Sequence, residues 1–309
     1  MSDLENVNGQ AKAPVQVKAK KPNKFLVVLF CVMVVVVSFV IQMIVSGIAI
    51  APLIASALRE ANGDMALYMK LAAQKMSDSS AYISKAQYVL FAINLVLAGI
   101  VYYFGYYRRE KKAGTLEKVG GKLKNVNSWL FLIVGELAVL SLSIILSNLA
   151  NSLMPEMSSF LEKALNTSLG DTEWLIFLFA AVVAPISEEL MFRGIIVSHS
   201  RKAFGIVGCI VISALLFSAY HMNPIQGLYV IPLGVFWGFA AYKFKSVVPG
   251  IICHIIQNGT SMLLGGSPIF ENTLFLGIVF VVTLVLTIFL YRKLDFLHKD
   301  KEVAVSAAN

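Results

Sequence analysis

Long apolar runs separated by short polar segments dominate this chain. A helix needs roughly 20 mainly apolar residues to cross a membrane. Eight runs are candidates, and they cover residues 25–50, 87–107, 128–149, 174–198, 205–221, 226–242, 247–265 and 273–291. No stretch alternates apolar and polar residues for long enough to predict a β-domain. The pattern therefore predicts an all-α, polytopic membrane helix bundle with about eight transmembrane helices.

Composition and charge agree with a membrane protein and predict its orientation. Hydrophobic residues make up 58% of the 309 residues and charged residues 14%, whereas soluble domains have about 45–50% and 25%. With the N-terminus inside, the inside segments hold 21 of the 26 Lys and Arg residues, as the positive-inside rule requires. We therefore expect both termini to be cytoplasmic. The net charge of +8 is then explained by basic loops that face lipid head groups, not by nucleic acid binding.

The runs divide the chain into four parts. Residues 1–24 form a basic cytoplasmic tail expected to be disordered, and 25–173 contain the first three transmembrane helices and two outside connectors. Residues 174–265 hold four helices, and 266–309 hold the last helix and a second cytoplasmic tail. The Lys-rich tail and the single bundle favour a multi-pass protein of a bacterial cell membrane. The three cysteines lie inside apolar runs, so no disulfide framework is predicted.

Ionisable and amide side chains inside the apolar runs concentrate in the second half of the chain. Such residues are costly in lipid and usually mark function. The helical motifs that carry them contain Glu188, Glu189, Arg193, Phe217, His221, His254 and Asn258. Glu136, in the third run, stands apart from them, and we interpret it as a structural or lumen-lining residue.

Helical spacing separates the two adjacent glutamates. At about 100° per residue, Glu189 and Arg193 share one face of a helix, and Glu188 points roughly 100° away from Glu189. We therefore predict that Arg193 pairs with Glu189 and makes that buried charge tolerable, which leaves Glu188 for another partner. Pro185 removes a backbone hydrogen bond and is expected to kink the helix one turn before Glu188.

The remaining polar residues repeat the four-residue spacing, so three helices can aim a carboxylate, two imidazoles and an amide at one point. A carboxylate in an apolar pocket can act as a general base. Histidine can position water, carry a proton or bind zinc, and an asparagine can stabilise an oxyanion. This set suits attack of water on an amide carbonyl. The predicted topology, however, separates His221 and His254 in depth by about 15 Å in straight helices, so tilt or a kink must bring them together.

The three motifs resemble those of the CAAX protease and bacteriocin-processing family of intramembrane proteases, also called the Abi family, which includes the type II CAAX prenyl endopeptidases. The resemblance covers about 174–265, where EExxxR, FxxxH and HxxxN motifs occur in order at 188–193, 217–221 and 254–258. It implies that Glu188 and His221 activate the attacking water, and that His254 and Asn258 hold the oxyanion. By the same resemblance Glu189, Arg193 and Phe217 are supporting residues.

The resemblance leaves the metal, the substrate and catalysis itself open. Glu188, His221 and His254 could bind Zn²⁺, but the HExxH motif is absent and no other general base is then obvious. The expected substrate is a peptide or a lipidated, membrane-associated protein. Two other functions use similar features. One is a catalytically silent membrane binding or bacteriocin-immunity protein, and the other is a transporter, for which the chain lacks an inverted repeat.

Overall fold

The computed structural model describes residues 22–114, 119–159 and 173–295, and every regular element in these ranges is a helix. The prediction of an all-α membrane bundle is confirmed. The predicted disordered tails fall almost entirely outside the described residues. Most of the second outside connector, residues 150–173, lies outside them too. The elements are α1 (Lys24–Ala61), α2 (Met65–Asp78), α3 (Ser80–Tyr102), η1 (Tyr103–Tyr107), α4 (Arg108–Lys112), α5 (Val119–Leu123), α6 (Val126–Leu153), α8 (Glu173–Leu178), η2 (Phe179–Val183), α9 (Ala184–Glu189), η3 (Leu190–Val197), α10 (Ser198–Tyr220), α11 (Pro224–Phe244), α12 (Val248–Leu264), η4 (Pro268–Phe270) and α13 (Thr273–Lys293).

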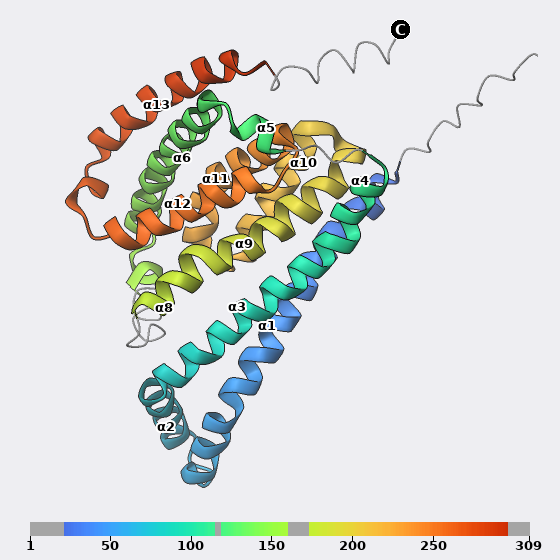
Figure 1. Cartoon of the computed structure of the whole chain (residues 1–309). Coiled ribbons are helices and arrows are strands. Elements are labelled where there is room, and N and C mark those ends of the chain that lie inside the picture. The colour runs from blue at the N-terminus through green and yellow to red at the C-terminus, as the bar shows by residue number, and fades with distance from the viewer. Residues whose placement is uncertain (1–21, 115–118, 160–172, 296–309) are drawn as a thin grey trace, which may run out of the picture.

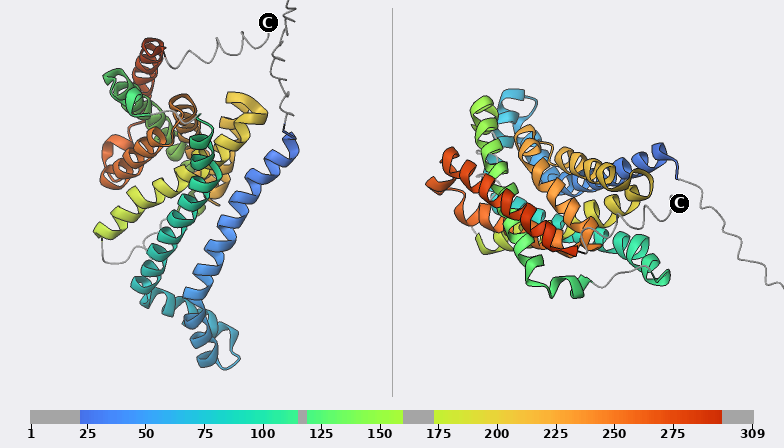
Figure 2. Two further views of the ribbon diagram at one scale, coloured as in Figure 1. Left: turned by 45° about the vertical axis from the view of Figure 1, so that its right-hand side comes forward. Right: turned by 90° about the horizontal axis from the view of Figure 1, so that it is seen from above.

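The first three helices form a long arm beside the rest of the bundle. Helices α1 and α3 run side by side and extend beyond the other helices, and α2 lies at their tip (Figures 1 and 2). Helix α1 has 38 residues because it continues beyond the apolar run 25–50, and it is longer than the roughly 20 residues that a bilayer requires. The N-cap of α1 is Asn23, whose side chain accepts the backbone N–H of Phe25, as caps of this type do.

Six helices of the described residues are long and apolar enough to cross a membrane. They correspond to the eight predicted runs with two differences. The runs 174–198 and 205–221 are joined in one helical stretch, Trp174–Tyr220, which is kinked at Gly205, where φ is 64°. The run 247–265 forms α12, which has 17 residues and is not among the six helices long enough to cross a membrane. The number of crossings and the cytoplasmic placement of the termini remain predictions.

Helix α11 lies at the centre of the core and packs against both α10 and α6. A Cβ at Gly234 would lie 3.3 Å from Ala214, and one at Gly238 would lie 3.5 Å from Ile210. These two glycines therefore bring α11 and α10 close together, because small residues let helix backbones approach in membranes. On the other side, a Cβ at Gly135 of α6 would overlap the ring of Phe236. The close packing fixes the positions of the polar side chains on all three helices.

Candidate active site

A cavity of about 630 Å³ gathers the predicted catalytic side chains. Its walls come from α6, the stretch from η2 to α9, the end of α10, α11 and α12. The four predicted catalytic residues all line it: Glu188, His221, His254 and Asn258. The rings of His221 and His254 lie 4.8 Å and 5.8 Å from the ring of Phe217. The two imidazoles therefore lie close together, and the depth difference expected for straight helices is absent. Helix α12 crosses the bundle obliquely (Figure 1), which is the tilt expected from the sequence.

The helix around Glu188 is irregular, because α9 is flanked by two π-helical segments, η2 and η3. Single π-helical turns often occur at functional sites. In η2 the backbone N–H of Ala184 donates to the carbonyl of Phe179, five residues earlier. In the same register the carbonyl of Ala180 would accept from residue 185, which is a proline without an N–H. Asn258 Nδ2 donates to this carbonyl at 2.9 Å. The irregularity predicted at Pro185 is therefore a π-helical turn whose freed carbonyl binds Asn258.

Glu189 is completely buried and joins two of the predicted site residues. Its Oε1 accepts a hydrogen bond from Arg193 Nη1 at 2.7 Å, and both side chains are 0% exposed. The predicted ion pair is therefore confirmed. The same oxygen lies 3.1 Å from His254 Nδ1. A carboxylate paired with arginine has no proton to give, so His254 Nδ1 must donate and its Nε2 is left as the acceptor of the neutral ring.

Glu188 lies on a different face of the helix and projects toward the cavity, as the spacing predicted. Its Oε2 lies 3.7 Å from His254 Nε2, and its side chain is 17% exposed. His221 Nδ1 lies 2.8 Å from the carbonyl of Phe217. A carbonyl can only accept, so Nδ1 donates and the Nε2 of a neutral His221 is also an acceptor. One carboxylate and two imidazole nitrogens thus line the same cavity as proton acceptors.

A glycine on α12 makes room for the buried glutamate. A Cβ at Gly250 would fall on Glu189 Oε2. We expect Gly250→Ala to displace Glu189 from His254 Nδ1 and to lower activity about tenfold or more, because small displacements in an active site are costly. Gly277→Ala on α13 is the matched control, since nothing lies within 4 Å of its Cβ position. Equal activity of the two variants in a cleavage assay would contradict the expectation.

The three candidate zinc ligands do not form a compact ligand cluster. Across residues 22–114, 119–159 and 173–295, no three His, Cys, Asp or Glu side chains are grouped so that they could hold a metal ion. Only the Nε2 atoms of His254 and His221 could bind a metal ion, because their Nδ1 atoms are hydrogen-bonded to Glu189 and to a backbone carbonyl. The arrangement in this structure does not fit the tetrahedral zinc geometry of three protein ligands and a water. We therefore assign no step to zinc.

A second cavity of about 340 Å³ adjoins the first and shares Glu188 with it. It lies between α1, α3 and the stretch from α9 to η3, and apolar side chains form most of its wall. Its apolar lining includes Met33, Val37, Leu97, Val101, Met191 and Ile195. Glu188 therefore stands at the junction of an apolar chamber and a more polar one.

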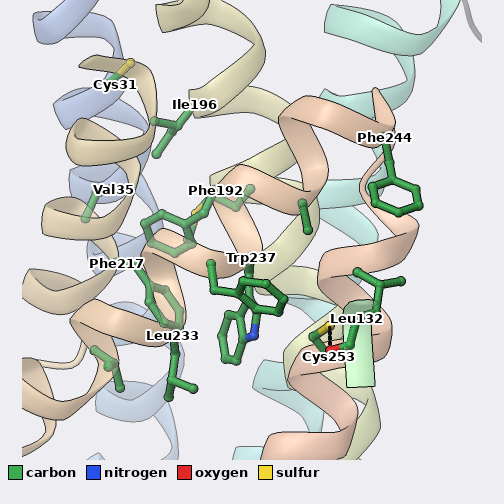
Figure 3. Close-up of a cluster of buried hydrophobic side chains, with 14 of the residues drawn as sticks. Cys31, Val35, Leu132, Phe192, Ile196, Phe217, Leu233, Trp237, Phe244 and Cys253 are labelled. Atoms are coloured by element: carbon green, nitrogen blue, oxygen red, sulfur yellow. Dashed lines mark hydrogen bonds between the residues drawn. The ribbon is translucent and has the colours of Figure 1, made fainter. Parts of the chain in front are cut away.

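The structure adds residues that sequence patterns did not single out. Trp237 lines the larger cavity, and its ring stacks on that of His254 at 4.1 Å. Tyr220 lines the apolar cavity and bonds to Gln42 of α1. Phe217 and Trp237 belong to the buried cluster drawn in Figure 3. The centroids of their rings are 5.8 Å apart. In the sequence, Trp237 and Tyr220 lie within apolar runs and look like ordinary core residues. Only the contacts of their polar atoms in the structure distinguish them.

Comparison with known proteins finds a family that matches the segment holding these residues. Residues 170–260 match the family model of type II CAAX prenyl endopeptidase Rce1-like proteins. The matched segment contains all three motifs, from Glu188 to Asn258. No curated protein and no solved structure matches the chain.

Proposed function

Because residues 170–260 match the family of type II CAAX prenyl endopeptidase Rce1-like proteins, we propose that this chain is an intramembrane protease that hydrolyses a peptide bond with a water molecule activated by Glu188 and histidine. The family match supports the protease class in general. The observation that supports the chemistry is the shared cavity, in which Glu188 Oε2 lies 3.7 Å from His254 Nε2. A carboxylate beside an imidazole can take a proton from water and pass it on.

The proposed reaction begins with a water in the larger cavity. Glu188 accepts one proton of this water, and the Nε2 of His221 accepts a hydrogen bond that orients it. The oxygen then attacks the carbonyl carbon of the substrate and forms a tetrahedral intermediate. Donors aimed at the developing oxyanion lower the barrier. Asn258 keeps a second N–H for this purpose, because its amide has two and one is bound to Ala180.

The proton taken by Glu188 must reach the leaving nitrogen for the peptide bond to break. His254 Nε2 lies 3.7 Å from Glu188 Oε2, and the proton moves to it from Glu188. The resulting Nε2–H then donates to the oxyanion and finally protonates the leaving amine. Glu189 holds the other ring nitrogen throughout, which fixes the orientation of the imidazole as second-sphere carboxylates do for other histidines.

The two adjoining cavities support a substrate with one polar and one apolar part. The scissile peptide would lie beside Glu188 in the larger cavity, where polar side chains surround it. An apolar chain attached to the substrate would occupy the chamber between α1 and α3. We therefore propose a peptide or lipidated protein at the membrane as the substrate, and surrounding lipids as the other contact of the helix bundle.

Cleavage of a defined peptide in the presence of a chelator tests this function and its metal dependence. The probe is an internally quenched peptide that ends in farnesyl-Cys, two aliphatic residues and a C-terminal residue. Purified protein in detergent is expected to cleave it, and to keep its rate within about twofold after treatment with 1,10-phenanthroline, because no step needs a metal ion as a Lewis acid. Loss of activity on chelation with recovery on adding Zn²⁺ would overturn the metal-free mechanism. Absence of cleavage would count against the substrate.

A further inference from the structure

Glu136 is a buried carboxylate that the proposed reaction does not use. It lies on α6 and is 1% exposed. A charged or polar group in a membrane bundle is costly unless it is hydrogen-bonded. Glu136 Oε2 accepts a hydrogen bond from the indole Nε1 of Trp237 at 2.8 Å, across 101 residues of sequence. The two residues are brought together where Gly135 lets α6 approach α11 closely.

The indole that Glu136 holds lies directly against the site. The rings of Trp237 and His254 are stacked, with centroids 4.1 Å apart and planes 23° apart. Trp237 also lies 5.8 Å from the ring of Phe217, and the guanidinium of Arg193 lies 5.3 Å from its ring. The indole therefore covers one face of the imidazole, while Glu189 holds its Nδ1 edge.

We propose that Glu136 is a positioning residue, which fixes the indole of Trp237 so that its ring holds the imidazole of His254 with Nε2 facing Glu188. The inference rests on the proposed function. A hydrogen bond at Nε1 restricts rotation of the indole, because a buried indole N–H has to keep its acceptor. A stacked ring resists tilting of its neighbour. The indole therefore holds one face of the His254 ring, and Glu189 holds its Nδ1 edge. Glu136 acts through the indole and touches neither substrate nor water.

Four variants test the inference with the farnesylated peptide described above. In Glu136→Gln, the amide oxygen can still accept the indole N–H, so kcat is expected to stay within about threefold. Glu136→Met keeps the volume but removes the acceptor, and is expected to lower kcat by about 10-fold or more with KM changed less than about threefold. Trp237→Phe keeps an aromatic ring without the N–H and is expected to lower kcat similarly.

The double variant Glu136→Met/Trp237→Phe separates positioning from a general structural role. If Glu136 acts through the indole, the double variant has a kcat no lower than the worse single variant, since coupled residues are not additive. Multiplied losses in kcat overturn the inference, and so does a folded Glu136→Met protein with unchanged kcat. If Glu136→Met does not fold, the kcat of Trp237→Phe tests the inference instead. An unchanged kcat in that variant overturns the inference, and a kcat about tenfold lower supports it.

Failure of this inference and failure of the proposed function give different results. If wild-type protein does not cleave the peptide, the proposed function fails for this substrate. If wild-type protein cleaves it and Glu136→Met is folded and equally fast, only the positioning role fails. Thermal unfolding of each variant in the same detergent shows where it unfolds. The values of kcat are then compared at a temperature at which all variants are folded.

Discussion

Replacing Glu188 by glutamine is expected to abolish measurable cleavage, with kcat lowered by about 10³-fold, within the range for loss of a general base. The substitution keeps the size and shape of the side chain but removes the group that accepts a proton from water. Glu188 forms no ion pair with Arg193, whose Nη1 binds Glu189, so the fold is expected to survive. Steady-state cleavage measures the loss of kcat, and thermal unfolding of the same preparation shows whether the fold is kept.

Glu60→Gln is the matched control for this substitution. Glu60 is an exposed glutamate near the end of α1, and it pairs with Lys75 at 2.7 Å. The same chemical change there is expected to leave cleavage unaltered, because neither Glu60 nor Lys75 lines the cavities that Glu188 joins and an exposed pair contributes little to stability. A Glu188→Gln protein that turns over substrate as fast as Glu60→Gln would remove Glu188 from the mechanism.

Replacing Arg193 by methionine is expected to destabilise the protein by about 3–5 kcal/mol, the usual cost of removing one partner of a buried ion pair. Both side chains of the pair are 0% exposed, so Glu189 would keep its charge without its strongest partner. Arg193 also donates to the carbonyl of Gly234 at 3.1 Å, and that bond is lost too. The unfolding midpoint in detergent is the measurement.

Two further variants test the cause of this loss. Arg201→Met removes a partly exposed arginine that lies 3.6 Å from Glu110, and it is expected to cost less than about 1 kcal/mol. The double variant Glu189→Leu/Arg193→Met replaces the buried pair by apolar groups and is expected to recover most of the stability. The double variant is expected to be inactive, because His254 Nδ1 has then lost its acceptor. Equal stability of Arg193→Met and Arg201→Met would contradict the role of the buried pair.

Local patterns in the sequence predicted the contacts that depend on one helix. The pairing of Glu189 with Arg193 needs only four-residue spacing, and it is present at 2.7 Å. The direction of Glu188, about 100° from Glu189, follows from the same periodicity. The irregular backbone near Pro185 was predicted as well, but its form was not. A missing N–H can produce a kink or a π-helical turn, and the choice depends on whether a neighbour such as Asn258 can bind the freed carbonyl.

Contacts between helices were much less predictable. The partnership of Glu136 with Trp237 joins residues 101 positions apart, and no periodicity in either helix indicates it. In the sequence, Glu136 is an isolated carboxylate in an apolar run, which is compatible with several partners. The apolar cavity between α1 and α3 was also not predictable, since the same apolar side chains would be suitable for packing against lipid.

By itself, the sequence determined that this chain is an all-α membrane protein with the protease motifs in its second half. Runs of apolar residues and four-residue spacings are properties of single helices, and every helix obeys the same geometry. The tertiary structure alone decided that His221 and His254 reach one cavity with Glu188. That outcome depends on how helices tilt and pack, which small residues such as Gly135 and Gly234 control through contacts with other helices.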